Sequence, residues 1–469
     1  MRIAIFSDNF YPELSGIPDV MLTCAKALAK QGHFVDFYAP YATRKNYEKS
    51  GLPFCELEMG ENVKVYRYSS LPFPSPTQQS RLVIPTGLRW VTLLKHKPDI
   101  IHSHTFFGTG LEALITAKVL NIPFIGTNHT AITEYSQYAP FKKDVFEKYS
   151  IRFLSWYYNH CDYIVSPSER ILREMEQHGL LKPHSVISNP LDKELFFFEP
   201  EKKSVLKSKL GFSPHTIIFA GRFAAEKKID VTIKAVALVK KTILDIQFVL
   251  AGHGSEEDHY KMLINELGLE ENIKFVGTLS KQDLSEAYRA SDLFVIASTS
   301  EIQSTSFMQA MACGLPVVAA RSRFGRTYSE DSNLLVNADD PESLALSMVR
   351  LFNDPILYES MQKSVLTQIE PFSTDAIVKD WEKVYQQTIA LAGVPKKRKR
   401  ILPKVALWSL RSILIGVMLG FYTLFMVIEF YPTSTYASTL QKQPTLTSKA
   451  KFTYHYLTED NDDNLKAAK

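Results

Sequence analysis

The fold is decided by residues 216–254, which read TIIFAGRFAAEKKIDVTIKAVALVKKTILDIQFVLAGHG. This segment opens with the short apolar run Thr216–Ala220, which is typical of a buried strand, and Val231–Lys240 is expected to be a helix. A second strand, Gln247–Ala251, ends at Gly252-His253-Gly254. Strand, helix and strand in this order predict a parallel sheet with helices on both faces.

The beginning of the chain has the same order of elements. Arg2–Phe6 is an apolar run, Asp19 can cap a helix, and Phe34–Tyr38 is the next strand, which together form a Rossmann-type opening unit. The apolar face of the helix would be Val20, Met21, Cys24 and Leu28. Later predicted strands are Asp99–His102, Pro123–Gly126, Tyr163–Val165, Ile273–Val276, Leu293–Ala297 and Pro316–Ala319, and helices are Leu111–Leu120, Val145–Tyr158, Tyr260–Leu267, Leu284–Ala290, Phe307–Cys313 and Pro341–Phe352. The segment Val186–Pro190 closes the first half of the chain.

Two Rossmann-like domains are predicted, over residues 1–195 and 196–372, with a linker near Pro190–Pro200. A chain of 469 residues suits two or three domains. Residues 373–393 are expected to form a closing helix, whose apolar side would be Ile377, Trp381, Val384 and Tyr385.

The composition excludes several classes of protein. The net charge of +4 does not suit a nucleic-acid binder. The four cysteines include no CxxC pair, so buried, reduced thiols are expected instead of a disulfide framework. Because Met1-Arg2 leads directly into the short run Ile3–Phe6, the beginning of the chain does not have the pattern of a signal peptide, and the catalytic part is expected in the cytoplasm.

Residues 394–431 combine a basic cluster, Lys396–Arg400, with the uncharged apolar run Ile413–Ile428. Counted on to Tyr431, the run approaches the roughly 20 residues that a membrane-spanning helix needs. The cluster resembles a nuclear-localisation signal, but beside an apolar run it is more simply a cytoplasmic flank that meets anionic lipid. We expect a single-pass membrane helix followed by a polar tail, residues 432–469, with a buried core helix as the alternative.

The turn after the strand Thr216–Ala220 contains two cations, Arg222 and Lys227. A turn between a strand and a helix lies at the carboxyl edge of a parallel sheet, where ligands bind in such folds. Fixed cations there suit a diphosphate, because they stabilise the charge that develops on a leaving nucleotide. A solvated basic surface is the alternative interpretation of this turn alone.

Residues 300–318 read SEIQSTSFMQAMACGLPVV. This stretch resembles the large family of retaining glycosyltransferases usually numbered four, whose pattern is Glu, seven residues, Glu, then Ala-x-Ala-x-Gly-x-Pro-Val-Val. The resemblance implies the GT-B fold, in which two Rossmann-like domains face a cleft, and an enzyme that transfers a hexose from a nucleotide sugar. Amides that open the Ser304–Cys313 helix can bind a phosphate, and the carboxylate of Glu301 can hold sugar hydroxyls.

The chain departs from the family pattern at the second acid, which is Gln309. In the family this position hydrogen-bonds the nucleotide ribose, and a glutamine carbonyl still accepts from a hydroxyl, although without charge assistance. Weaker or altered donor binding is therefore expected. The donor-binding residues implied by the resemblance are Gly16, Arg222, Lys227, Gly252, Gly254, Glu301, Ser304, Thr305 and Gln309.

Other segments match the family over about residues 1–392. Ser15-Gly16 lies where the family's glycine loop approaches the diphosphate, and Gly32–Val35 fits its Gly-His-x-Val strand entry. Ser188–Asp192 resembles the family's linker between domains, with Pro190 in place of glycine, and Gly252-His253-Gly254 is placed as its nucleotide loop.

The acceptor is indicated by His102–Thr105 and Gly126–Thr130, which look like the branch that contains diacylglycerol glucosyltransferases and phosphatidylinositol mannosyltransferases. In that branch the histidine at the position of His129 lies beside the donor sugar, whereas a lone histidine is more often structural. His129, Glu301, Arg222 and Lys227 are therefore the predicted catalytic residues.

The expected reaction is transfer of glucose from UDP-glucose to diacylglycerol or a related membrane lipid, with retention of configuration. No cofactor or metal is expected, since the only Asp-x-Asp motif, Asp460-Asn461-Asp462, lies in the polar tail. Two alternatives stay open: a polysaccharide or protein acceptor, and a non-catalytic membrane scaffold, which Gln309 would suit.

Overall fold

The computed structural model describes residues 1–13, 15–50, 52–72, 81–130, 143–298, 303–320, 335–336 and 339–393. The chain divides into two compact units. Unit 1 consists of Met1–Ile187 and the chain from Lys379 onward, and unit 2 is Ser188–Val378.

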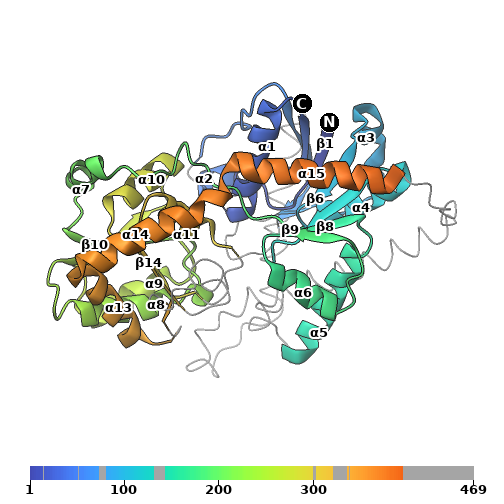
Figure 1. Ribbon diagram of the computed structural model, residues 1–469. Coiled ribbons are helices and arrows are strands. Elements are labelled where there is room, and N and C mark those ends of the chain that lie inside the picture. The colour runs from blue at the N-terminus through green and yellow to red at the C-terminus, as the bar shows by residue number, and fades with distance from the viewer. Residues whose placement is uncertain are drawn as a thin grey trace. The chain divides into compact units, whose positions relative to one another are not determined.

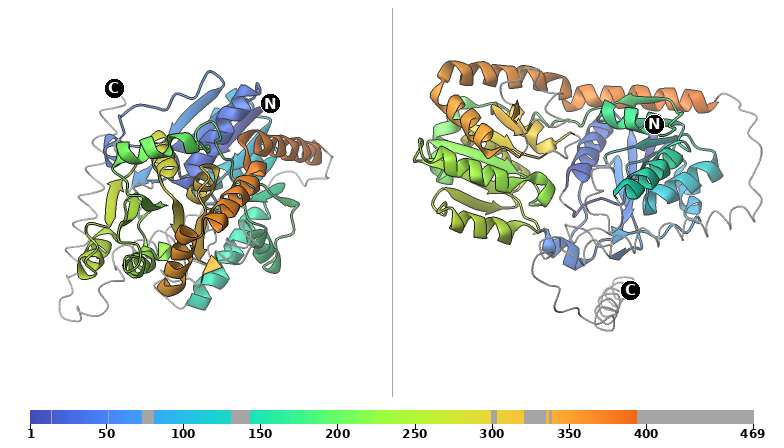
Figure 2. Two further views of the ribbon diagram at one scale, coloured as in Figure 1. Left: turned by 60° about the vertical axis from the view of Figure 1, so that its left-hand side comes forward. Right: turned by 90° about the horizontal axis from the view of Figure 1, so that it is seen from below.

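Unit 1 contains a parallel seven-stranded sheet with the strand order β3-β2-β1-β6-β7-β8-β9. Strands β1, β6, β8 and β9 are labelled in Figure 1. Helices lie on both sides of the sheet (Figure 2). The elements in chain order are β1 (Arg2–Phe6), α1 (Gly16–Lys30), β2 (Phe34–Pro40), α2 (Arg44–Lys49), β3 (Val63–Tyr68), β4 (Leu71–Pro72), β5 (Arg81–Leu82), α3 (Trp90–His96), β6 (Ile100–Ser103), α4 (Gly108–Leu120), β7 (Phe124–Thr127), α5 (Lys143–Tyr158), β8 (Tyr163–Ser166), α6 (Glu169–Gln177) and β9 (His184–Val186).

The opening unit of the sheet forms as the apolar pattern predicts. Residues 3–6 of β1 are buried, and β1 lies between β2 and β6. Helix α1 buries Val20, Met21, Cys24 and Leu28, the predicted face. The predicted cap is wrong, however, because the helix begins at Gly16 and its N-cap is Ser15. Pro18 fits inside the first turn because amides there have no partner within the helix.

Unit 2 contains a parallel six-stranded sheet with the order β12-β11-β10-β13-β14-β15. Its core is formed by strand residues such as Ile217, Phe248 and Phe294, which are fully buried. The elements are η2 (Pro200–Lys202), α7 (Lys203–Leu210), β10 (His215–Ala220), η3 (Ala225–Lys227), α8 (Ile229–Val239), β11 (Ile246–Ala251), α9 (Glu257–Glu266), β12 (Ile273–Gly277), α10 (Lys281–Ala290), β13 (Leu293–Ile296), α11 (Thr305–Ala312), β14 (Val317–Ala320), β15 (Leu335–Val336), α13 (Pro341–Asn353), α14 (Pro355–Ile369), η5 (Glu370–Phe372) and α15 (Thr374–Gly393).

Both sheets reverse their winding beside a central strand. In unit 1 the strand order changes direction between β1 and β6, and in unit 2 it changes between β10 and β13. Ligands of open α/β sheets bind outside the carboxyl ends of the strands at such points. The sheet topology therefore directs attention to the segments that follow β1, β6, β10 and β13.

The burial of side chains in the closing helix, and of three of the four cysteines, is as the sequence predicts. Helix α15 buries Ile377, Trp381, Val384 and Tyr385, its predicted apolar side. Of the four cysteines, all of which are free, only Cys55 is exposed, so the expectation that all are buried is wrong at that position.

No helix in the described part of the chain is long and apolar enough to cross a membrane. The predicted membrane helix over Ile413–Ile428, the basic cluster Lys396–Arg400 and the polar tail lie outside the described residues.

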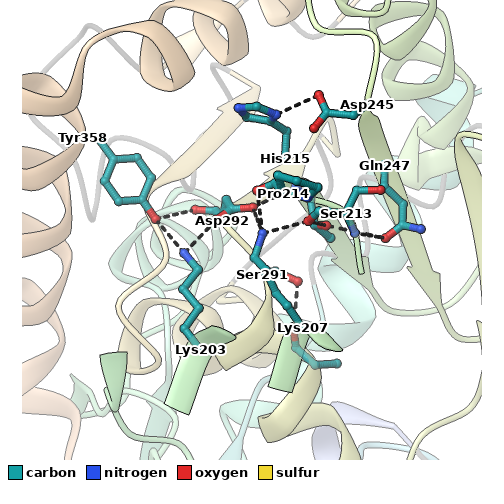
Figure 3. Close-up of polar contacts among 12 residues, drawn as sticks. Lys203, Lys207, Ser213, Pro214, His215, Asp245, Gln247, Ser291, Asp292 and Tyr358 are labelled. Carbon is teal, nitrogen blue, oxygen red and sulfur yellow. Dashed lines mark hydrogen bonds and ion pairs between the residues drawn. The ribbon is translucent and has the colours of Figure 1, made fainter. Parts of the chain in front are cut away.

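A polar network joins the amino ends of two strands of unit 2 (Figure 3). The carboxylate of Asp292, just before β13, accepts from the ammonium groups of Lys203 at 2.8 Å and Lys207 at 2.5 Å and from the N–H of Thr216 at 2.7 Å. The hydroxyl of Tyr358 on α14 donates to the Asp292 carbonyl at 3.0 Å. This network fastens α7 and α14 to the edge of the sheet opposite the carboxyl ends, which indicates a structural role.

Replacing the central carboxylate should destabilise unit 2. Asp292→Asn removes the carboxylate that pairs with two half-buried lysines, so we expect the free energy of unfolding to fall by about 2–4 kcal/mol. The exposed pair Asp230–Lys234 provides the control, and Asp230→Asn should cost less than about 0.5 kcal/mol. Urea titration of both variants measures the difference, and equal costs would contradict a structural role for the network.

Candidate active site

The turn after β10 is locked to the loop after β11 by backbone hydrogen bonds. The N–H of Gly221 donates to the Ala251 carbonyl at 2.9 Å, and the N–H of Phe223 donates to the His253 carbonyl at 2.9 Å. The Phe223 carbonyl in turn accepts from Glu256 at 3.2 Å. Two loops at the carboxyl edge of the sheet therefore form one rigid piece of backbone.

Gly252 and Gly254 are required by this contact. A Cβ at Gly252, whose φ of 136° already disfavours a side chain, would overlap the carbonyl oxygen of Gly221. A Cβ at Gly254 would overlap the carbonyl oxygen of Phe223. The sequence predicts that these glycines lie in a nucleotide-binding loop. The structure shows that their lack of side chains makes room for the backbone of the neighbouring turn. Contact with a nucleotide stays a prediction.

Arg222 projects from the locked turn, but it is not an isolated cation. Its guanidinium donates to the carboxylate of Glu226 at 2.6 Å, and Glu226 is nearly buried. The pairing holds the guanidinium beside the carboxyl end of β10, and guanidinium groups are suited to binding phosphate. Lys227 is the last residue of the 3-10 turn η3, and Lys228 beside it pairs with Asp339 at 2.8 Å.

Helix α11 presents its N-terminus after the loop that follows β13. Its N-cap is Ser304, whose hydroxyl accepts from the N–H of Phe307 at 3.5 Å and meets the hydroxyl of Ser306 at 3.0 Å. The N–H groups of Thr305 and Ser306 make no hydrogen bond within the described residues. Such amides attract anions, because the helix dipole places partial positive charge there.

Gln309 and Glu301 are two further residues predicted to bind the donor. Gln309 is half-buried on the second turn of α11. Glu301 lies outside the described residues, so its predicted contact with the sugar stays a prediction.

Sequence reasoning missed the side chain that holds the loop before α11. The amide oxygen of Gln303 accepts from the backbone N–H of Asn189 at 2.6 Å, and the side chain of Asn189 donates to the Gln303 carbonyl at 3.1 Å. Both side chains are buried. The signal was present in Ser188–Asp192, the linker-like segment, but a linker asparagine does not reveal a partner 114 positions away.

In unit 1, Asp8 follows β1 at the reversal of the sheet. Its carboxylate accepts from the N–H of Thr109 at 2.8 Å, at the start of α4, and from the hydroxyl of Thr105 at 2.9 Å. Burial raises the pKa of Asp8 to about 6, against the lowering effect of these hydrogen bonds. Asp8 is a second residue that the sequence did not single out, and it fastens β1 to the segment that follows β6.

Gly16 is the exposed first residue of α1. The N-cap Ser15 makes no side-chain hydrogen bond to the helix, and Pro18 has no N–H. The amides of Gly16 and Ile17 have no hydrogen-bond partner among the described residues. The start of α1 is thus a second helix N-terminus suited to an anion, in line with the role predicted for Gly16.

His129 belongs to a cluster of three histidines at the ends of β6 and β7. Its Nε2 lies 2.8 Å from Nδ1 of His104. The His104 ring lies 4.0 Å, centroid to centroid, from that of His102. His102 in turn bonds the hydroxyls of Thr127 at 2.7 Å and Tyr385 at 2.9 Å. The interpretation of His129 as a lone histidine is therefore replaced by a connected set, with His129 the member that is only half-buried.

The histidines are held uncharged. Burial lowers the pKa of His102 to about 3 and that of His129 to about 4, and it lowers the pKa of His104 well below its usual value, with the neighbouring imidazoles adding to the shift at His102 and His104. An uncharged His129 can orient a sugar hydroxyl by hydrogen bonding, but it does not supply a positive charge at neutral pH.

Across the described ranges of the chain, no three His, Cys, Asp or Glu side chains are arranged so that they could hold a metal ion. The cations and helix N-termini described above are groups that can bind phosphate.

The family of the chain follows from comparison with known proteins. Residues 14–195 match the model of Glycosyltransferase Family 4, and residues 202–366 match that of Glycosyl transferases group 1. The chain belongs to the GT-B glycosyltransferases, with a family 4 domain followed by a group 1 domain, and it is a hexosyltransferase enzyme.

Among its relatives is an alpha-monoglucosyldiacylglycerol synthase of Acholeplasma laidlawii, 23% identical over 400 residues, which cover 83% of this chain and 98% of the relative. A protein of the same name from Streptococcus pneumoniae is 28% identical over 404 residues, 81% of this chain and 86% of the relative. The solved structure of Anabaena Alr3699/HepE in complex with UDP and glucose superimposes with a TM-score of 0.64 at 20% identity, covering 82% of this chain and 100% of that one. This structural likeness confirms the predicted α/β GT-B fold.

The close contact between the turn after β10 and the loop after β11 predicts that a side chain at Gly254 destabilises the fold. Gly254→Ala should lower the free energy of unfolding by about 2–4 kcal/mol, because the new methyl group overlaps backbone that cannot move away. Gly268→Ala is the matched control: its φ of 63° makes alanine strained, but nothing lies within 4 Å, so a cost of about 1–2 kcal/mol is expected. If denaturant titration gave Gly254→Ala the smaller cost, the lock would not constrain this edge.

The histidine cluster predicts acid-sensitive stability. The folded cluster stays uncharged down to about pH 4, whereas unfolded histidines take up protons below about pH 6.5, so the unfolded state binds more protons between these values. The contribution of the cluster to the free energy of unfolding should be fully present above pH 6.5 and should be lost as the pH falls toward 4. His102→Asn should flatten this slope by up to about 1.4 kcal/mol per pH unit. Cys24→Ala, which alters buried core without removing an imidazole, should keep the slope; an unchanged slope in His102→Asn would show that the histidine is not involved.

Proposed function

We propose that this glycosyltransferase moves glucose from UDP-glucose onto a membrane lipid such as diacylglycerol, with retention of anomeric configuration and without a metal. The observation that carries the donor half of the proposal is the locked turn after β10, which holds Arg222 at the reversal of the unit 2 sheet. The lipid acceptor is supported by the two alpha-monoglucosyldiacylglycerol synthases among the relatives.

The donor would bind through several groups of unit 2. Arg222, together with Lys227 from the same turn, would bind the diphosphate and offset the charge that develops as the nucleotide leaves. The amides of Thr305 and Ser306 at the start of α11 would bind a phosphate oxygen. Gln309 would accept a ribose hydroxyl, and Glu301 would hold the hydroxyls of the transferred sugar.

Unit 1 would supply the acceptor side. The N-terminus of α1 at Gly16 would approach the diphosphate, and His129 would orient the donor sugar. The bond between the anomeric carbon and the diphosphate oxygen would break while the acceptor hydroxyl attaches on the same face. The proton of that hydroxyl would pass to the departing phosphate oxygen, so no covalent enzyme intermediate is needed.

Unit 1 also carries a surface suited to a bilayer. Helix α5 exposes Val145, Tyr149 and Trp156, with Tyr149 64% exposed, and the same face carries exposed Lys148 and Arg152. Aromatic and basic side chains on one helix face are typical of the interface between water and anionic lipid. We propose that α5 lies on the cytoplasmic membrane surface, with Lys396–Arg400 and an Ile413–Ile428 span as further attachments.

A polysaccharide or protein acceptor is the second candidate. The GT-B fold itself does not select an acceptor, because function depends on the site and not on the fold. A non-catalytic scaffold is disfavoured by the intact Arg222 and α11 elements, although Gln309 stays a departure from the family pattern.

The test is a transfer assay with purified full-length protein, radiolabelled UDP-glucose and vesicles that contain diacylglycerol. Labelled monoglucosyl lipid is expected, and Arg222→Ala should lower kcat/KM by about 100-fold. Vesicles without diacylglycerol, soluble polysaccharide and other nucleotide sugars serve as comparisons. Transfer only to the polysaccharide would favour the second candidate, and no transfer from any donor would refute the enzyme assignment for this chain.

The membrane role of α5 predicts weaker vesicle binding by Tyr149→Ala/Trp156→Ala. Loss of their contact with lipid should reduce binding to anionic vesicles about 10-fold. Tyr149 is 64% exposed, whereas Trp156 is 36% exposed and also loses its ring contacts with Phe153 and His160. Met262→Ala on α9, which removes another exposed apolar side chain, is the control and should bind as the wild type does. Co-sedimentation measures both, and equal binding by all three proteins would remove α5 from the membrane contact.

A further inference from the structure

The His102, His104 and His129 cluster is connected to helix α15 through aromatic side chains. The hydroxyl of Tyr385 lies 2.9 Å from Nδ1 of His102, and the ring of Trp381 lies 4.7 Å from the His102 ring. Trp381 and Tyr385 stack on each other at 5.7 Å, and both are buried. All of these residues belong to unit 1, since α15 counts toward it from Lys379 onward. A continuous set of contacts therefore runs from α15 to His129.

The hydrogen bond between His104 and His129 restricts the protonation of both rings. Two uncharged imidazoles share one N–H across a bond between Nδ1 of His104 and Nε2 of His129. If His104 donates from Nδ1, then Nε2 of His129 accepts, and His129 carries its hydrogen on Nδ1. If His129 donates from Nε2, then His104 accepts at Nδ1 and carries its own hydrogen on Nε2. In both cases the two residues have the same tautomer.

His102 makes the cluster rigid without setting its charge. Both of its ring nitrogens meet hydroxyl groups, Thr127 at Nε2 and Tyr385 at Nδ1, and hydroxyls can donate or accept. Its ring lies against that of His104 at 4.0 Å, and Tyr158 holds the Thr127 carbonyl at 2.9 Å. His104 is thus fixed on one side by a packed, fully bonded neighbour and on the other by His129.

We propose that His104 is a positioning residue that sets the tautomer and the ring orientation of His129, and that Tyr385 of α15 supports it through His102. The inference rests on the proposed function, in which His129 orients the donor sugar. With Nε2 occupied by His104, Nδ1 is the nitrogen of His129 that meets the sugar. Within the described residues, Nδ1 of His129 has no other hydrogen-bond partner.

The experiment combines nitrogen-15 NMR of histidine-labelled full-length protein with kinetics. The wild type should show His104 and His129 in the same tautomer, each peak assigned by loss on substitution. His104→Leu should convert His129 to a mixture of tautomers and lower kcat by about 10- to 100-fold, while KM for UDP-glucose changes less than about threefold. His104→Asn, whose amide lies near the position of Nδ1, should restore a single His129 tautomer and most of kcat.

Variants on α15 test the more distant support. Tyr385→Phe removes the hydroxyl from His102 and should lower kcat about 3- to 10-fold. Thr388→Val removes another buried α15 hydroxyl, which among the described residues bonds only the Val384 carbonyl of its own helix, and should leave kcat unchanged. Equal effects of the two variants would overturn the role of Tyr385.

The outcomes separate this inference from the proposed function. A wild-type protein with different tautomers at His104 and His129, or a His129 spectrum unaffected by His104→Leu, would overturn the positioning role even in an active enzyme. A wild type that transfers no sugar would overturn the proposed function, whereas the tautomer measurement would still decide whether His104 controls His129.

Discussion

The carboxyl edge of the unit 2 sheet depends on one backbone contact, the lock between the turn after β10 and the loop after β11. Phe223 and Gly221 donate to carbonyls of the β11 loop, and Gly252 and Gly254 leave room for those bonds. Because these bonds join backbone groups, the two loops can adopt few other conformations relative to each other. Arg222 extends from it, and the pairing with Glu226 removes much of the freedom that a surface arginine would have. The result is a cation placed before a ligand arrives, which is the condition for electrostatic stabilisation at low reorganisation cost.

The sheet of unit 1 also reverses its winding, but the groups at its carboxyl edge differ from those in unit 2. Asp8, His104 and His129 follow β1, β6 and β7 at the carboxyl edge of the unit 1 sheet; His104 is buried, and Asp8 and His129 are half-buried. Three neighbouring imidazoles would repel one another if charged, and burial keeps them neutral. Unit 2 thus carries a paired cation at the carboxyl edge of its sheet, and unit 1 carries a cluster of uncharged imidazoles at the carboxyl edge of its own sheet. Under the proposed function, the cation would offset charge that develops on the nucleotide, and His129 would orient the sugar.

Much of the fold could be predicted from the sequence, because buried parallel strands are short apolar runs with little ambiguity. Runs such as Arg2–Phe6 and Thr216–Ala220 became central strands. The start of α1 was predicted incorrectly, since Asp19 has the chemistry of a cap while the backbone places Ser15 there. The short elements β3, α2 and α3 were not predicted, and their boundaries depend on tertiary packing more than on local pattern.

Contacts between residues of one short segment could be predicted from the sequence. Contacts between residues that are far apart in the sequence could not. The spacing of Arg222 and Glu226, four residues apart, could have indicated their pairing. The bond between His104 and His129 depends on the register of β6 against β7, in which Ser103 lies opposite Gly126, and no local pattern contains that information. The same holds for Asn189 and Gln303, and for Asp8 with Thr109.

The central claim is that the locked turn presents Arg222 to the diphosphate of the donor, and isothermal titration with UDP-glucose tests it most directly. Arg222→Met should weaken binding about 10-fold or more, because a charge-assisted contact with phosphate is lost. Lys228→Met, which removes the neighbouring cation that pairs with Asp339, should change the dissociation constant by less than about threefold. Equal dissociation constants for wild type and Arg222→Met would contradict the account.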